Sequence, residues 1–121
     1  IPNLNGSWKC EGLSVMRRGS VVDFPWSGEI RITQSWTKIS IHISTSQSGS
    51  RSTSASLVHE PGVGYRLFYH YTNAPKADQT NLQKHDGTAE ILFAEDCLSG
   101  EGHYFTDQHR MTTGTMKLQK A

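Results

Sequence analysis

Apolar and polar residues alternate along most of this chain, and almost no stretch places apolar residues at helical spacing. The clearest case is Lys38 to Thr45, where three isoleucines alternate with polar side chains. Such alternation is typical of a strand with one buried face. The pattern predicts eight strands, at approximately residues 7–14, 27–34, 37–45, 50–58, 64–72, 86–94, 98–106 and 111–119.

The connections between these strands favour a barrel. Those near residues 34–36, 59–63 and 95–97 are short, whereas 15–26 and 73–85 are longer. Consecutive hairpins of this kind close into an up-and-down barrel, which leaves no edge strand exposed. We therefore predict an all-β fold, in which the whole chain forms one eight-stranded antiparallel up-and-down β-barrel of the lipocalin-like type.

Strand parity assigns an interior to this barrel, because alternate side chains point to opposite faces. On strand 37–45 the isoleucines point inward, and so does Thr45 by the same parity. The rule places a further set of residues inside: Gly28, Ile30, Ile32, Leu67, Tyr69, Tyr71, Gly102, Tyr104, Met116 and Leu118. Strand 50–58 is ambiguous. We place the alternate set with the apolar members Ala55 and Leu57 inside, which puts Arg51 inside at one end.

The two ends of the predicted barrel differ in character. The end with the short connections is filled by isoleucine, leucine and methionine, and Trp8 and Trp36 are expected to close it. The other end, which has the long connections, collects inward aromatic, hydroxyl and guanidinium groups. These candidate ligand-binding residues are Trp26, Thr45, Arg51, Tyr71, Asn73, Tyr104, Thr106, Arg110 and Thr112. The distribution predicts a plugged floor beneath an open polar mouth.

Two arginines among aromatic rings suggest a ligand that is an anion carrying a flat ring. Arginine binds phosphate through paired, charge-assisted hydrogen bonds, hydroxyl groups donate to remaining oxygens, and aromatic faces stack on bases. A nucleotide meets all three requirements. The alternative is structural: Arg110 could pair with Asp107, while the tyrosines fill the barrel with their hydroxyls reaching solvent.

Composition and charge exclude some function classes. Twelve Lys or Arg residues against eleven Asp or Glu give a net charge of +1, which argues against a duplex-DNA or membrane-surface binder. The longest apolar run, Ile91 to Ala94, is far shorter than the roughly 18 to 20 residues of a membrane helix. No targeting-peptide pattern is present at the start of the sequence.

Catalytic and metal-binding signals are weak. The histidines do not have the spacing of a recognised metal site, and the serines lack a nucleophile elbow or a neighbouring base. We expect no enzymatic activity, no metal and no cofactor. Cys10 and Cys97 are far apart in sequence, so one disulfide and two free thiols both remain open.

Several short motifs occur in order along the chain and resemble one bacterial family. The motifs are Pro2 to Trp8 (PNLNGSW), Ile32 to Ile39 (ITQSWTKI), Tyr69 to Asn73 (YHYTN), His85 to Ala89 (HDGTA) and Gly102 to Thr106 (GHYFT), followed by Arg110 and Thr113 to Thr115 (TGT). Together they cover nearly the whole chain. They resemble the β-strand-rich sensor domain of the two-transmembrane CBASS antiphage effectors, whose small barrel replaces a STING domain.

The resemblance implies a function in antiviral defence by abortive infection. In that family the barrel binds a cyclic dinucleotide made by a partner nucleotidyltransferase. It then signals to N-terminal membrane helices that assemble and disrupt the bacterial inner membrane. Those helices are absent from this sequence, so the chain would be the cytoplasmic domain of an inner-membrane protein. It would self-associate on activation and have no DNA partner. The contact residues come from barrel parity, not from the resemblance.

Two other classes of protein stay open. A lipocalin-like or avidin-like carrier shares the Gly-x-Trp start and the eight strands, but it would usually line its cavity with apolar groups up to the mouth. A hydrolase is the second alternative, and the sequence lacks a convincing nucleophile and base for it.

Overall fold

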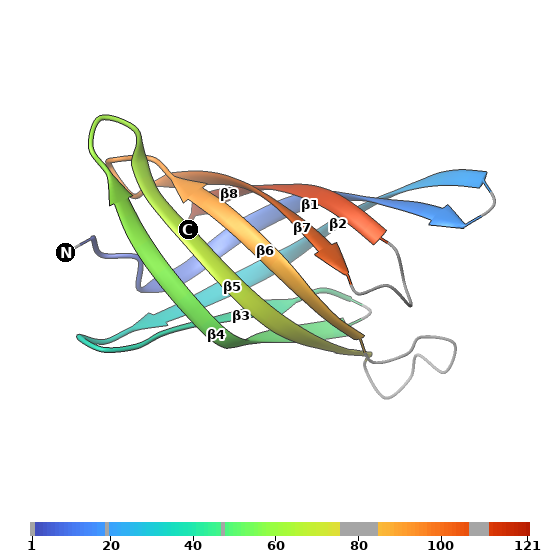
Figure 1. The fold of residues 1–121 in the computed structure, drawn as a ribbon, viewed down its shortest axis with the longest axis horizontal. Coiled ribbons are helices and arrows are strands. Elements are labelled where there is room, and N and C mark those ends of the chain that lie inside the picture. The colour runs from blue at the N-terminus through green and yellow to red at the C-terminus, as the bar shows by residue number, and fades with distance from the viewer. Residues whose placement is uncertain (1, 19, 47, 76–84, 107–111) are drawn as a thin grey trace.

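The structure is a computed structural model of a closed β-barrel, and it describes residues 2–18, 20–46, 48–75, 85–106 and 112–121 (Figure 1). Strands adjacent in the chain pair antiparallel, and β1 pairs with β8 to close the barrel. The strands are β1 (Gly6–Arg18), β2 (Ser20–Gln34), β3 (Ile39–Ser44), β4 (Ser48–Glu60), β5 (Gly64–Pro75), β6 (His85–Phe93), β7 (Ser99–Thr106) and β8 (Thr112–Lys120). The predicted eight-stranded up-and-down barrel is confirmed.

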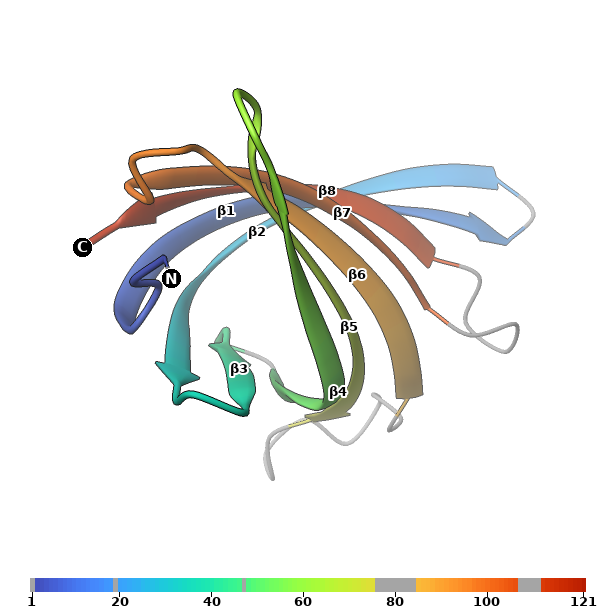
Figure 2. The ribbon, with the colours of Figure 1, turned by 60° about the vertical axis from the view of Figure 1, so that its left-hand side comes forward.

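Strands β1 and β2 are longer than predicted and form a hairpin that projects beyond the barrel (Figures 1 and 2). Their pairing continues to Arg18 and Ser20. In contrast, β8 reaches β1 only as far as Met16, and β3 joins β2 only from Glu29 onward. The prediction of a long connection at 15–26 is therefore wrong. The tip of this ribbon, beyond the last β1–β8 pair at Met16, has no interior face, so the alternation on which the prediction depended does not extend through it.

The barrel interior is a solid apolar core at the end where β1 begins. Apart from the glycines Gly28 and Gly102, the inward residues predicted on β2, β3, β5, β7 and β8 lie in this core or line the cavity above it, as expected. Trp8 is fully buried, and its ring packs edge-on against Phe93 with 5.1 Å between centroids. The indole N–H of Trp8 donates to the carbonyl oxygen of Leu4 at 3.1 Å. Leu4 is itself fully buried, so the segment before β1 helps to close the floor.

Trp36, which we expected in the same plug, is instead 90% exposed, so that prediction is wrong. It lies in the turn after the last β2–β3 pair, where the Ser35 N–H donates to the Lys38 carbonyl at 2.8 Å. A residue in such a turn lies beyond the end of the ladder and has no interior face. The sequence pattern could not indicate Leu4 as its replacement, because Leu4 precedes the first strand.

A β-bulge on β4 corrects the predicted orientation of Arg51. The register of β4 against β5 shifts between Ser52 and Ser54, and a bulge reverses the parity of the residues on one side of it. Below the bulge, Ala55 and Leu57 pack against the core as predicted. Above it, Ser50 and Ser52 have the inward parity. Arg51 is exposed on the outer face, so its predicted inward orientation is wrong.

The same bulge marks where β3 and β4 separate. Direct pairing of the two strands extends only over His42 to Ser44 on β3. Next to that pairing, the Ile41 N–H donates to the side-chain hydroxyl of Ser52 at 2.9 Å. The serine oxygen thus replaces a backbone acceptor at the point where the ladder ends.

Both cysteines are free thiols in this structure, which settles the choice that the sequence left open. Cys10 is buried in the floor core, and burial raises the pKa of its thiol to about 12. Cys97 is half-buried in the turn between β6 and β7 and has a left-handed backbone with φ of 59°.

The two tryptophans at this end make a matched pair for testing the plug. Trp8→Ala should lower the free energy of unfolding by about 3 to 5 kcal/mol, because it leaves a large cavity in a packed core. Trp36→Ala should change it by no more than about 0.5 kcal/mol, as expected for an exposed side chain. Urea denaturation followed by far-ultraviolet circular dichroism would measure both. Equal losses in the two variants would contradict the assigned floor.

Candidate functional site

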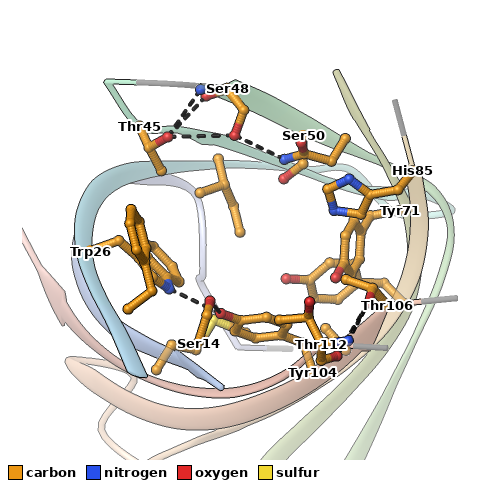
Figure 3. A pocket seen from close by; sticks show the side chains of 16 residues that line it. Ser14, Trp26, Thr45, Ser48, Ser50, Tyr71, His85, Tyr104, Thr106 and Thr112 are labelled. Carbon is orange, nitrogen blue, oxygen red and sulfur yellow. Dashed lines mark hydrogen bonds between the residues drawn. The ribbon is translucent and has the colours of Figure 1, made fainter. Parts of the chain in front are cut away.

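A cavity lies inside the barrel at the end opposite Trp8, with a volume of about 140 Å³ (Figure 3). All eight strands contribute side chains to its wall. The lining residues are Ser14, Phe24, Trp26, Ile43, Thr45, Ser48, Ser50, Tyr69, Tyr71, Asn73, His85, Ala89, Tyr104, Thr106, Thr112 and Met116. The predicted plugged floor beneath an open, aromatic and hydroxyl-lined mouth is therefore present in this fold.

The structure brings most of the nine predicted site residues together. Seven of them line the cavity: Trp26, Thr45, Tyr71, Asn73, Tyr104, Thr106 and Thr112. Arg51 does not, because the bulge on β4 turns it to the outer face opposite His42 and Thr72. Arg110 lies outside the described residues, so its orientation stays a prediction.

Tyr104 is the central hydrogen-bonding group of the cavity wall. Its hydroxyl accepts a hydrogen bond from the indole N–H of Trp26 at 2.9 Å and is also hydrogen-bonded to the hydroxyl of Ser14. The Trp26 and Tyr104 rings lie 6.2 Å apart at an angle of 59°. Since the three residues come from β2, β7 and β1, this contact fixes two rings across separate parts of the wall.

Hydroxyl groups form two further connections at the mouth. The Ser48 N–H donates to the Thr45 hydroxyl at 3.1 Å, and the Asn73 side-chain amide donates to the Ser48 hydroxyl at 3.1 Å. On the other side, the Thr112 N–H donates to the Thr106 hydroxyl at 2.8 Å. These bonds hold the strand ends of β4, β5, β7 and β8 in place and leave polar groups facing the opening.

The described wall of the cavity has no carboxylate, ammonium or guanidinium group. It contains no Asp, Glu, Lys or Arg, and its titratable groups are three tyrosines and His85. Burial raises the pKa of Tyr69 far above its usual range, so this phenol stays neutral. Its ring lies 6.0 Å from that of Tyr71. Such a wall suits stacking and hydrogen bonding, and it offers no lysine or arginine side chain to an anion.

Comparison with known proteins identifies the family. Residues 1–120 match the Cap15 cyclic dinucleotide receptor domain. The chain belongs to this family. It is also 42% identical over 120 residues to CD-NTase-associated protein 15 of Yersinia aleksiciae, which covers 99% of this chain. The resemblance to the CBASS sensor barrel drawn from the motifs is thus confirmed, and the ligand class that the Cap15 receptor family implies is a cyclic dinucleotide.

The Cap15 match also bears on the alternative functions, enzyme and carrier, that the sequence left open. It is a match to a receptor domain and indicates no catalytic family, and it favours a receptor over a lipocalin-like carrier. The chain spans 56% of the length of the Yersinia relative. In the residues that the structure describes, no helix is long and apolar enough to cross a membrane.

Several cavity residues of this Cap15 receptor domain escaped the sequence prediction. Ser14 ends the predicted strand 7–14, for which no inward residue was assigned at the mouth, and Ser50 was missed because the bulge reverses the parity of β4. His85 was placed in a loop, but it is the first residue of β6 and lies beside Tyr71 in the wall (Figure 3). If the pairing of His85 with Asn73 on β5 had been predicted, it would have placed His85 in the cavity wall.

The hydrogen bonds of Tyr104 can be tested by removing one oxygen atom. Tyr104→Phe should lower the free energy of unfolding by about 1 to 3 kcal/mol, because the partly buried indole N–H of Trp26 loses its acceptor. Tyr65→Phe is a matched control, since its hydroxyl makes no hydrogen bond to another described residue and its loss should cost at most about 0.5 kcal/mol. Thermal denaturation would measure both, and equal effects would contradict the role given to Tyr104.

Proposed function

We propose that this Cap15 receptor domain binds its cyclic dinucleotide in the barrel cavity, through the mouth opposite the Trp8 floor. The observation that carries the proposal is the convergence of three aromatic side chains, Trp26, Tyr71 and Tyr104, on one cavity rimmed by hydroxyl groups (Figure 3). Base–aromatic stacking contributes about 1 to 3 kcal/mol per base. Hydroxyls such as those of Thr45 and Thr106 can donate to phosphate or ribose oxygens.

Phosphate groups are commonly bound by arginine or lysine, and the described wall contains neither. Arg110 follows β7 and precedes β8, and both strands reach the mouth through Thr106 and Thr112. Apart from Arg51, whose side chain is on the outer face, Arg110 is the arginine closest in sequence to a cavity-lining residue, and arginine binds phosphate with charge-assisted hydrogen bonds. We assign Arg110 the phosphate contact, and Arg51 on the outer face has no part in it.

Ligand binding would act on the rest of a longer protein. The segment before β1 lies at the floor end, as the burial of Leu4 and its hydrogen bond to Gln34 indicate. A preceding membrane-spanning region would therefore join the barrel at the end away from the mouth. In this proposal the barrel is the cytoplasmic part of a bacterial inner-membrane effector, and the bound ligand triggers self-association and disruption of the membrane by that region.

A thermal-shift panel tests the ligand class directly. Cyclic dinucleotides, linear dinucleotides, fatty acids and biotin would each be added to the folded chain. A ligand at about a hundred times its dissociation constant stabilises a fold by roughly 2.7 kcal/mol. Stabilisation by a cyclic dinucleotide and by none of the other compounds is the expected result, whereas stabilisation by fatty acid or biotin alone would support a carrier.

The two arginines give a matched test of the phosphate contact. Arg110→Ala should weaken binding of the best cyclic dinucleotide about tenfold to a hundredfold, because a charge-assisted hydrogen bond contributes roughly 1.5 to 3 kcal/mol. Arg51→Ala should leave affinity unchanged, and Arg110→Lys should recover part of the loss. Isothermal titration calorimetry would measure all three. If Arg110→Ala bound normally but melted well below the wild type, Arg110 would be a structural partner of a carboxylate such as Asp107.

A further inference from the structure

Three of the aromatic rings that line the cavity stand directly opposite a glycine on a neighbouring strand. These cross-strand pairs are Trp26 with Gly12, Tyr71 with Gly87, and Tyr104 with Gly114. They join β2 to β1, β5 to β6 and β7 to β8. The arrangement therefore repeats at three separate places around the barrel wall, and Figure 3 shows the three rings on different sides of the same cavity.

The rings occupy the space that a larger residue than glycine would need. A Cβ atom at Gly12 would lie 2.2 Å from Cε2 of Trp26, and one at Gly114 would lie 2.3 Å from Cζ of Tyr104. At Gly87 it would lie 2.3 Å from the hydroxyl oxygen of Tyr71. Each ring thus lies against the wall, over its glycine, and the centre of the cavity stays open.

The open space has the size of one flat ring system. Its volume of about 140 Å³ is close to the roughly 150 Å³ of an engineered apolar cavity that holds a benzene molecule. A cyclic dinucleotide carries two bases and two phosphates, which is much more than this space can enclose.

We propose that the cavity takes a single base of the cyclic dinucleotide, and that Gly12, Gly87 and Gly114 determine how large that base can be. The second base and the phosphodiester ring then lie toward the mouth. This inference rests on the proposed function, because it assumes that the cavity is the cyclic dinucleotide site. It makes three residues without side chains the determinants of base selectivity.

Two of the three glycines offer clean substitutions. At Gly12 and Gly114 the nearest atoms to an added methyl group all belong to the far end of a Trp26 or Tyr104 side chain, so the ring can tilt into the cavity while the backbone stays in place. At Gly87 the methyl group would also lie 2.7 Å from the backbone oxygen of Phe105, which would disturb β-sheet pairing. Gly49 on β4 is the matched control, because its nearest atom would be 3.8 Å away.

The test measures the affinity of each variant for cyclic diadenylate, cyclic diuridylate and the mixed adenylate–uridylate ring by calorimetry. In Gly12→Ala and Gly114→Ala the affinity for the tightest wild-type ligand should fall at least tenfold, and the loss should be greater for ligands with larger bases. Gly49→Ala should bind as the wild type does. Trp26→Phe enlarges the cavity, so it should shift the preference in the opposite direction, toward purines.

The outcomes separate this inference from the proposed function. If the wild type binds no cyclic dinucleotide, the proposed function fails and the inference fails with it. If the wild type binds but folded Gly12→Ala and Gly114→Ala keep its affinity, or lose all ligands by the same factor, only the inference is overturned. Should both alanine variants fail to fold, Trp26→Phe decides, since an unchanged preference between bases would contradict the inference.

Discussion

The lumen of an eight-stranded barrel is only wide enough for the side chains of its own strands, and this limit governs how the receptor domain can hold a ligand. Space inside appears only where large inward residues stand opposite small ones. Tyr69 lies between Ala55 and Ala89, and Tyr104 lies between Ala89 and Gly114. Below this layer, large residues such as Trp8 and Phe93 fill the lumen completely. The cavity is therefore a consequence of where small residues occur along the strands.

The same limit explains why charge is kept outside the barrel. Arg66 on β5 forms ion pairs with Glu60 and Glu90, and these three residues belong to the outer face. The hydrogen bonds from Arg66 lower the pKa of the Glu60 carboxyl group and raise that of the guanidinium. A charge in the described lumen would have little water and no room for a partner, and burial of an unpaired charge is costly. A lumen without Asp, Glu, Lys or Arg thus suits a base, and the phosphates of the ligand are left to the mouth.

Much of the fold could be predicted from the sequence, because alternation reports directly on which face of a strand is buried. The isoleucines of β3 and the three tyrosines Tyr69, Tyr71 and Tyr104 were placed inside on this ground, and they lie there. Position 51 was misplaced because a β-bulge depends on how two strands pair, and one strand's residue pattern does not record it. Trp36 was misplaced because a turn residue has no parity.

The candidate site was predictable for the same reason and to the same extent. Seven cavity residues follow the parity rule along regular strands. The role of Gly12 and Gly114 could not be read from the sequence, because a glycine acquires it only from the ring opposite, and that register is set by the closed barrel. The sequence motifs identify the family, and the family implies the class of ligand. The size of the cavity can be obtained only from the structure.

The most direct test of this account is nuclear magnetic resonance of the complex with the tightest cyclic dinucleotide, using intermolecular contacts between base protons and protein side chains. If the cavity holds a single base, the protons of that base should contact the rings of Trp26, Tyr71 and Tyr104, and those of the other base should contact none of these rings. Contacts confined to outer-face residues such as His42 and Arg51, with none inside the barrel, would contradict this account.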